Sequence, residues 1–384
     1  MPTTLLTDWL DIFSAWEAPG RCFGRARDSH GLLRSNLGWI GLELGAHGLR
    51  WAQLERRGTE FAIARRWSTE WSELDAPPAD LSTTNLREIC PELAPTRKLF
   101  RGKALAFCLP TGGWEWRNLE LPTADERELR QMAHQELAAE MQLDPEEIAS
   151  DYWRVEEGDK SLRDGITPVL AVGVATDFST RIANDCLAAG FLPQVCEVAP
   201  WALARSVLLA QPRLCGAYAV LHIGERDTSI ILCRAGKPLY IRQVRQIGYM
   251  QLLAPICEAW QISTSEAAAI LKKAGLAGDS HRGGGNVSAL LNQLLARVCG
   301  ELCGELDRTW AYVGRVYPKL LPETMWLTGS GGEIPGLDGV LQQKFEIVTQ
   351  PWSLQPLISV WSAGADAPYA MAAGLSALAW EEPA

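Results

Sequence analysis

The segment "IGLELGAHGLRWAQLER" (residues 40–56) holds two strand-like apolar runs on either side of a glycine turn. A second segment with the same layout, "VLHIGERDTSIILCR", lies at residues 220–234. Aligned without a gap, Leu42 matches Leu221 and Gly45 matches Gly224. Alternating apolar residues around a glycine turn are typical of a β-hairpin. The repeat therefore predicts two related domains, each opening with its own hairpin.

The composition is that of a globular protein, with 47% hydrophobic and 21% charged residues in a chain of 384. This length suits two domains of ordinary size. The formal net charge of −10 argues against nonspecific nucleic-acid binding and against docking on an anionic membrane surface. No window approaches the roughly 20 apolar residues of a membrane-spanning helix. We therefore expect a cytoplasmic protein without direct membrane insertion and with reduced cysteines.

Helical and strand patterns fill both halves of the chain. Each hairpin is followed by a third predicted strand, "EFAIARRWST" in the first half and "PLYIRQVRQ" in the second. The 3.6-residue spacing of apolar residues predicts a helix over 124–141 with many acids on its other face, and the apolar run 166–175 predicts a strand. Residues 287–317 have the pattern of a long helix, and residues 1–35 form an extension with one predicted amphipathic helix.

A third glycine-rich loop, "TGSGG" (residues 328–332), follows a predicted strand late in the chain. Consecutive backbone N–H groups in such loops can bind phosphate oxygens. A dinucleotide fingerprint is excluded because that motif opens a βαβ unit and needs an acid about 20 residues further on. Together, the three loops suggest a nucleotide site. The alternative is that the third loop is a plain turn between a strand and a helix.

The order of these features resembles the actin-like ATPase superfamily, and within it the PilM family of type IV pilus assembly proteins, relatives of FtsA. The resemblance is carried by residues 40–56 and 220–244 as the two phosphate segments and by "LTGSGGEIPGL" (327–337) as the adenosine segment. It is also carried by residues 119–153, with a Leu-Pro turn, a Glu-rich helix and an acidic link to an Asp-aromatic strand. The similarity extends from Leu37 to the end of the chain.

The resemblance implies an α/β, actin-like ATPase fold of two RNase-H-like lobes with a small inserted α/β subdomain. The expected domains are an extension over 1–35, lobe 1 over 36–213 with the insertion near 103–175, lobe 2 over 214–355, and a C-terminal helix (356–384) returning to lobe 1. Trp114 and Trp116 would then belong to the core or to the wall of a partner groove. The acidic helix would border that groove.

ATP and Mg²⁺ are the cofactors that the resemblance implies. Glu43 would hold Mg²⁺ through water. The candidate nucleotide-binding residues in the first segment are Gly45, Ala46, His47, Gly48 and Arg50; those in the second half are Gly224, Glu225, Arg226, Thr228, Lys272, Gly329, Ser330, Gly331 and Gly332. His47 could contact a phosphate or simply tolerate the turn.

Three positions depart from the family pattern. His222 stands where the second phosphate segment usually has Asp, Arg50 where Lys is common, and Ala269 where a Glu usually meets the ribose. A carboxylate can hold metal waters or orient an attacking water, and an imidazole contributes far less. We therefore expect no efficient hydrolysis and assign no catalytic residue. Two interpretations remain, a nucleotide bound through backbone N–H groups or a site that has lost its nucleotide.

The resemblance implies a cytoplasmic scaffold, peripheral at the inner membrane, that binds the cytoplasmic tail of a PilN-like membrane protein and contacts other pilus platform proteins. The scaffold could equally belong to a related secretion or DNA-uptake platform. One alternative is an active ATPase or sugar-type kinase, in which Asp227 replaces the missing Asp. Another is an FtsA-like cytoskeletal protein, although the ending "LAWEEPA" carries no basic amphipathic helix.

Overall fold

The computed structural model describes residues 36–45, 48–71, 85–90, 93–155, 165–276, 285–354 and 366–381. The predicted N-terminal helix, Ala46 and His47 lie outside these residues. The chain divides into two compact units. Unit 1 comprises Met1–Thr59, Ile63–Ala199 and Leu375–Ala384, and unit 2 comprises Glu60–Ala62 and Pro200–Gly374.

The main sheet of unit 1 has the strand order β3-β2-β1-β4-β8. Its strands are β1 (Leu37–Gly45), β2 (Gly48–Arg57), β3 (Glu60–Glu70), β4 (Ala104–Cys108) and β8 (Leu192–Cys196). β1 and β2 form the predicted antiparallel hairpin, and β1, β4 and β8 run parallel. Ile40 and Leu42 are fully buried, and Trp51 stacks on Phe191 at 5.0 Å between ring centroids. The apolar side chains of the first segment therefore face a core, as predicted.

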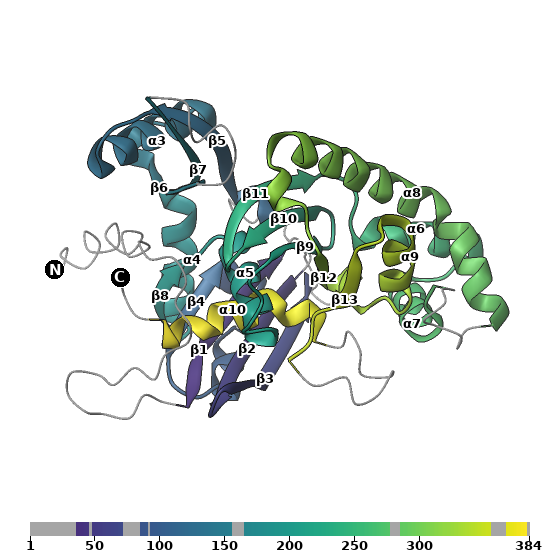
Figure 1. The fold of residues 1–384 in the computed structure, drawn as a ribbon. Coiled ribbons are helices and arrows are strands. Elements are labelled where there is room, and N and C mark those ends of the chain that lie inside the picture. Colours follow the sequence, from purple (N-terminus) through teal and green to yellow (C-terminus); the bar gives the residue numbers. More distant parts are fainter. Residues whose placement is uncertain are drawn as a thin grey trace. The chain divides into compact units, whose positions relative to one another are not determined.

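A second, three-stranded sheet is inserted between β4 and β8 and is called the inserted sheet (Figure 1). Its order is β5-β7-β6, with β5 (Trp114–Pro122), β7 (Ile166–Ala175) and β6 (Ile148–Arg154) all antiparallel. Helix α3 (Glu126–Met141) begins at Asp125, whose side chain accepts a hydrogen bond from the Glu128 N–H at 2.9 Å. Its apolar stripe buries Leu129, Ala133 and Leu137 against the inserted sheet.

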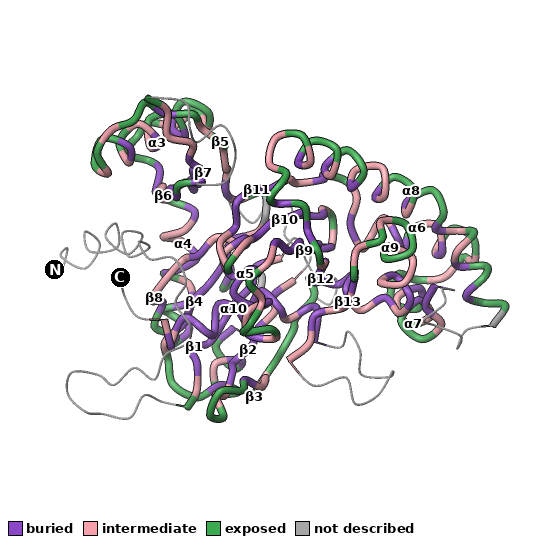
Figure 2. The backbone as a smooth tube through the Cα atoms, in the orientation of Figure 1, coloured by how far each residue is buried: buried purple, intermediate pink, exposed green. Residues whose placement is uncertain are grey.

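The inserted sheet is apolar on both faces. Val169 and Ala171 of β7 belong to the core shared with α3. Successive side chains of a strand point to opposite faces, so Leu170, Val172 and Val174 lie on the face away from α3. All three are buried, and Figure 2 colours the backbone by burial. The face of the inserted sheet away from α3 is therefore also covered by the chain.

Unit 2 repeats the hairpin arrangement in a sheet of order β11-β10-β9-β12-β13. Its strands are β9 (Ala217–Ile223), β10 (Thr228–Arg234), β11 (Lys237–Val244), β12 (Thr324–Thr328) and β13 (Val348–Pro351). Every residue of β9 is buried, as expected for a central strand whose two faces are both covered. The second predicted hairpin and its third strand are thereby confirmed.

Helices α6 (Tyr249–Trp260), α7 (Thr264–Ala274), α8 (Gly285–Val316) and α9 (Leu337–Phe345) belong to unit 2. α7 has the capping box that its sequence suggests, with Ser263 and Glu266 exchanging bonds between side chain and backbone. α5 (Ala199–Ala210) and α10 (Ala370–Ser376) pack closely, because a Cβ at Gly374 would stand 1.9 Å from the Ala202 carbonyl oxygen. In the described chain, none of the helices combines the length and hydropathy needed to cross a bilayer.

The remaining elements are α4 and a set of short helices. They are the α-helices α1 (Leu86–Ile89), α2 (Leu93–Thr96) and α4 (Thr176–Ala188), and the 3₁₀ helices η3 (Arg97–Leu99), η4 (Thr111–Gly113), η5 (Pro145–Glu147), η7 (Pro318–Leu320), η8 (Ser330–Glu333), η9 (Ala367–Tyr369) and η10 (Ala377–Trp380). α4 is followed by Gly190 at φ +91°, a backbone conformation that favours glycine at the end of a helix.

Candidate functional site

The first glycine turn places Glu43 and Arg50 opposite each other on β1 and β2. Glu43 is 4% exposed, and its Oε1 lies 3.4 Å from Arg50 Nη1. A carboxylate that already faces a guanidinium is a poorer ligand for Mg²⁺, since the two cations compete for it. At the turn, a Cβ on Gly48 would stand 2.2 Å from the Thr69 carbonyl oxygen, so close packing against β3 accounts for this glycine.

The second glycine turn, between β9 and β10, is joined to the start of α6. The Gly224 N–H donates to the Asp227 carbonyl at 3.0 Å, and the Tyr249 and Met250 N–H groups donate to the carbonyls of Gly224 and Glu225. Thr228 Oγ1 donates to the Ile247 carbonyl at 2.6 Å. The two turn residues Gly224 and Glu225 thereby satisfy N–H groups at the first turn of α6.

Asp227 has a structural role in this turn. Its Oδ1 accepts a hydrogen bond from the Gln246 N–H at 3.1 Å, just after β11. An acid held in this way fixes the path of the backbone. The geometry gives no support to Asp227 as the general base of an ATPase or kinase.

His222 is the penultimate residue of β9 and is 7% exposed. Its Nδ1 lies 3.1 Å from Thr328 Oγ1 on the neighbouring parallel strand β12. The glycine loop that follows β12 presses on the end of β9, because a Cβ at Gly329 would meet the Ile223 carbonyl oxygen at 2.4 Å. A Cβ at Gly331 would meet the Ile223 side chain at the same distance. Two of the three candidate loops thus lie side by side in unit 2.

In unit 2, acidic side chains bind two of the candidate nucleotide residues. Ser330 Oγ donates to Glu225 Oε1 at 2.5 Å, and Lys272 forms an ion pair with Glu333. ATP carries several negative charges and binds where donors and cations converge. The backbone loops are compatible with a phosphate, but Glu333 already neutralises Lys272.

Glu43 as a magnesium ligand remains a prediction. Mg²⁺ prefers carboxylate oxygens around near-octahedral geometry. His222 occupies the position expected for a carboxylate, and Glu43 faces Arg50. Among the described residues there is no group of three or more His, Cys, Asp or Glu arranged to hold a metal. No reaction step is assigned to these residues.

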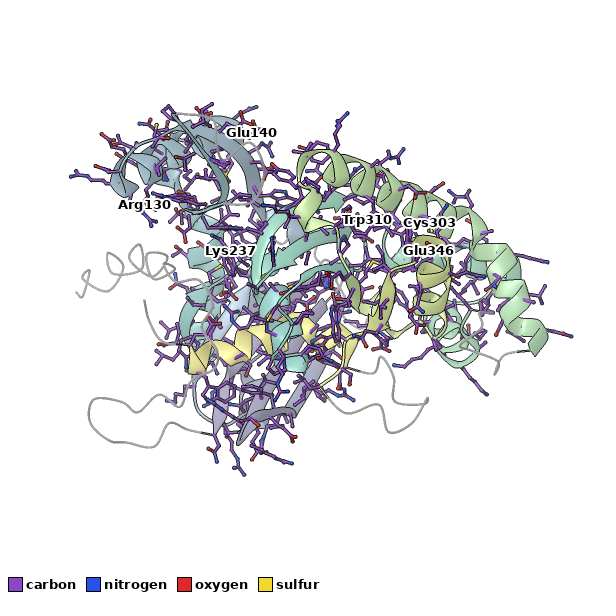
Figure 3. The ribbon with its side chains drawn as sticks, in the orientation of Figure 1. Arg130, Glu140, Lys237, Cys303, Trp310 and Glu346 are labelled. Carbon is purple, nitrogen blue, oxygen red and sulfur yellow. The ribbon has the colours of Figure 1, made fainter. Side chains whose placement is uncertain are left out.

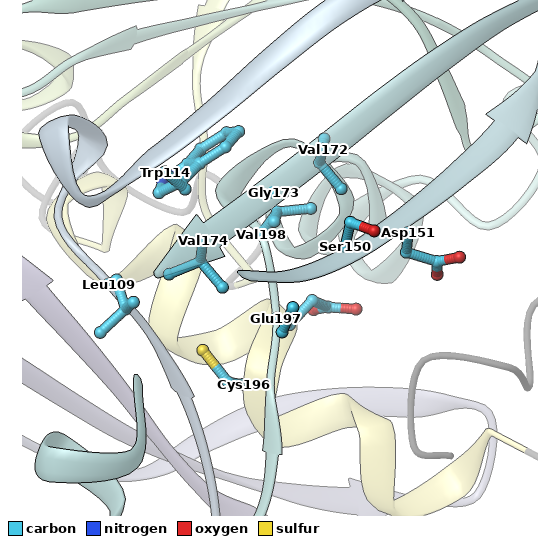
Figure 4. A pocket seen from close by; sticks show the side chains of 11 residues that line it. Leu109, Trp114, Ser150, Asp151, Val172, Gly173, Val174, Cys196, Glu197 and Val198 are labelled. Carbon is cyan, nitrogen blue, oxygen red and sulfur yellow. The ribbon is translucent and has the colours of Figure 1, made fainter. Parts of the chain in front are cut away.

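Unit 1 contains a small pocket on the face of the inserted sheet away from α3 (Figure 4). Its volume is about 20 Å³, enough for a water molecule or the end of an aliphatic side chain. The inserted sheet contributes Trp114, Ala149, Ser150, Asp151, Val172, Gly173 and Val174; the ends of β4 and β8 contribute Leu109, Cys196, Glu197 and Val198. The lining is mostly apolar, which favours an apolar ligand group.

Two titratable groups at this pocket have raised pKa values. Burial raises the pKa of Asp151 to about 6, although the Tyr152 N–H and Arg130 both favour its ionised form. Arg130 lies on α3 (Figure 3). Its Nη1 is 3.0 Å from Asp151 Oδ1. Burial, and then Glu197, raise the pKa of the Cys196 thiol to about 12, so at neutral pH it remains a thiol and acts as an apolar wall.

The sequence predicted a role for only some of the pocket residues. Trp114 was predicted to be core or groove wall, and it is 6% exposed and lines the pocket. Asp151 belongs to the Asp-aromatic strand on which the resemblance rests in part. Nothing in the sequence pointed to Cys196 or Glu197, since only the pairing of β4 with β8 brings them here.

No family model and no curated protein matches the chain. Among solved structures, a chain of the PilM–PilN type IV pilus biogenesis complex matches 91% of this chain and 100% of its own length, with a TM-score of 0.69 and 19% sequence identity. The fold is actin-like. The fold class predicted from the resemblance is thereby confirmed.

Two further solved structures have lower TM-scores. The ethanolamine utilization protein EutJ from Carboxydothermus hydrogenoformans has a TM-score of 0.49 at 12% identity, covering 88% of this chain and 89% of its own. MreB 5 of Spiroplasma citri, bound to AMPPNP, has a TM-score of 0.48 at 11% identity, covering 88% and 94%.

The ion pair on Lys272 predicts how nucleotide affinity responds to one acid. Glu333→Gln removes the negative charge and leaves Lys272 available to a phosphate, so we expect MgATP to bind several-fold more tightly than to the unaltered chain. Titration calorimetry measures the change. Glu301→Gln removes an acid from an exposed ion pair with Arg297 and is the matched control. Equal affinity for all three chains would remove Lys272 from the nucleotide site.

The raised pKa of Asp151 predicts a pH-dependent stability. A buried carboxyl with a pKa near 6, against 3.8 when exposed, stabilises the fold only while protonated. This contribution is complete below about pH 4 and is lost as the pH rises through 6. Asp151→Asn keeps an acceptor for the Tyr152 N–H and does not titrate. At pH 7.5 we expect it to raise the free energy of unfolding by about 1–3 kcal/mol, and at pH 4 to change little.

Thermal melting of both chains at pH 4, 6 and 7.5 measures this difference. Asp307→Asn is the control, because Asp307 forms a comparable ion pair with Lys344 but its side chain is 55% exposed. A gain for Asp151→Asn that is the same at every pH would contradict the assignment.

Proposed function

We propose that this chain is a scaffold of a type IV pilus, or of a related secretion platform, and that it binds the cytoplasmic tail of a PilN-like membrane protein. Through that partner it would be held at the inner membrane, where other platform proteins would also contact it. The observation that carries the proposal is the match with a chain of the PilM–PilN complex over all of that chain's length. At 19% identity the match supports an assembly role through the fold as a whole.

The unit 1 pocket is the place proposed for the tail. It is bordered by two strands at sheet edges, β6 of the inserted sheet and β8 of the main sheet. Edge strands carry backbone groups that can pair with an added peptide. The hollow between them is apolar and small. An extended tail could therefore lie along the edges and place one aliphatic side chain in the hollow.

A role in assembly also agrees with the side chains around the glycine loops. His222, Asp227 and Glu43 all have partners that hold the fold together. None is placed to activate a nucleophile or to hold Mg²⁺. The proposed function therefore includes no turnover of ATP. A nucleotide bound through the backbone loops would be a structural ligand.

Filling the pocket tests the proposal. Ala149 is 9% exposed and lines the hollow, so Ala149→Leu would occupy the space needed by the tail. Ala139→Leu makes the same change on the exposed side of α3. We expect the first variant to weaken binding of a synthetic peptide with the sequence of the PilN-like tail at least tenfold, and the second to leave it unchanged. Titration calorimetry on the full chain provides both affinities.

Two results would count against the proposal in different ways. If the unaltered chain does not bind the tail, with or without ATP, the scaffold function is wrong. If the tail binds and both leucine variants bind it equally well, the function stands and the pocket is the wrong place.

A further inference from the structure

Four cations lie close together in unit 1, in a segment that is called the basic loop (residues 97–103). Its sequence, "RKLFRGK", contains no acid and carries Arg97, Lys98, Arg101 and Lys103. Lys98, Arg101 and Lys103 are exposed. Within the described part of the chain, no ion pair includes any of the four cations. The basic loop is therefore a local positive surface on an acidic protein.

Hydrogen bonds to its main chain hold the basic loop against strands β2 and β3. Gln53 of β2 binds both main-chain groups of Arg101, accepting from the N–H at 3.0 Å and donating to the carbonyl at 2.7 Å. Arg65 of β3 donates from Nη1 to the Leu99 carbonyl at 2.9 Å. The loop is thus fixed before any ligand arrives, which lowers the entropy lost on binding.

Exposed apolar side chains flank the basic loop. In the described part of unit 1, the large apolar side chains that are exposed are Trp67, Leu99, Leu187 and Leu192. Leu99 belongs to the loop itself, and the Leu192 N–H donates to the Lys103 carbonyl at 2.7 Å. Trp67 follows Arg65 by two residues on β3. Cations and apolar side chains are therefore mixed on this part of unit 1.

This mixture matches the surface of an anionic lipid bilayer. The net charge of −10 argues against such docking for the chain as a whole. However, the attraction of lysine and arginine to anionic lipids falls off within a Debye length of about 10 Å, so the local charge decides. Leucine and tryptophan beside cations are typical of segments that adsorb at lipid interfaces. An acidic protein partner would account for the cations but not for the apolar side chains beside them.

We propose that the basic loop binds the surface of an anionic lipid bilayer. The phosphates of the lipid headgroups contact Lys98, Arg101 and Lys103. Leu99 and Leu192 lie at the boundary between the headgroups and the acyl chains, and no segment crosses the bilayer. This inference goes beyond the proposed function, in which the chain reaches the membrane only through its partner. A direct lipid contact and a bound tail would together hold the chain more tightly than either alone.

The experiment uses the full chain, without any tail peptide, and two kinds of vesicle. One kind is pure phosphatidylcholine, and the other mixes phosphatidylcholine and phosphatidylglycerol two to one. Lys98→Gln combined with Lys103→Gln removes two exposed cations of the basic loop. Lys273→Gln combined with Lys319→Gln is the matched control, because it removes two exposed lysines of unit 2 and gives the same net charge. Cosedimentation at 50 and 300 mM salt measures binding, and thermal melting confirms that both variants are folded.

We expect the unaltered chain to bind the mixed vesicles and not the pure phosphatidylcholine vesicles. Binding should weaken at 300 mM salt as the charges are screened. At 50 mM salt the variant of the basic loop should bind at least tenfold more weakly, since each cation near an anionic surface contributes about fivefold. The unit 2 variant should bind as tightly as the unaltered chain.

A leucine substitution tests the apolar part of the contact. Leu99→Ala should weaken binding to the mixed vesicles about threefold, because less apolar surface leaves water. Leu290→Ala is its control, since Leu290 lies in unit 2 and its exposure of 49% is close to the 43% of Leu99. Equal binding of these two variants would show that Leu99 does not reach the bilayer.

The results separate this inference from the proposed function. If the unaltered chain does not bind the mixed vesicles, the inference is wrong, and an acidic protein segment becomes the ligand to test on the basic loop. If both lysine variants bind the vesicles equally well, the basic loop is not the lipid contact. Neither result affects the scaffold function, because binding of the PilN-like tail is measured separately and should be the same for all these chains.

Discussion

A three-stranded sheet with two apolar faces needs cover on both, and this constraint shapes the part of unit 1 to which we assign function. α3 covers one face with a stripe that includes Leu129 and Leu137. The other face carries Val172 and Val174, which are buried near the ends of β4 and β8. Where these surfaces meet, they leave a small hollow bordered by strand edges. The candidate partner site is thus a direct result of how the inserted sheet is covered.

Close packing alone accounts for the glycines of the loop after β12. In unit 2 the loop after β12 lies so near the end of β9 that a side chain at Gly329 or Gly331 would collide with Ile223. These glycines are required by the fold whether or not a nucleotide is bound. The side chains that would act on a nucleotide face partners of the protein itself, as Glu43 faces Arg50.

Much of the fold could be predicted because short stretches of the sequence carry the apolar patterns of its strands and helices. The alternation around Gly45 and Gly224 predicts both hairpins, and the helical spacing of Leu129 and Leu137 predicts α3. The pairing of Glu43 with Arg50 also follows from the register of a hairpin whose turn lies between Gly45 and Gly48. The sequence alone predicts that both residues lie at a nucleotide site. The strand register shows that they also face each other.

The pocket could not be predicted in the same way, because its residues come from strands far apart in the chain. Cys196 and Glu197 join it only through the parallel pairing of β4 with β8, which no local pattern indicates. The unsatisfied Nε1–H of Trp114 is equally invisible in the sequence, since it depends on what surrounds the indole. The assignment of nucleotide-binding residues remains a prediction.

Hydrogen–deuterium exchange of the full chain, with and without the PilN-like tail peptide, tests the central claim most directly. The account predicts slower exchange on binding in residues 114–118, 148–154 and 196–198, the strand edges and turn around the unit 1 pocket. Protection confined to unit 2, with no change in these three segments, would contradict it.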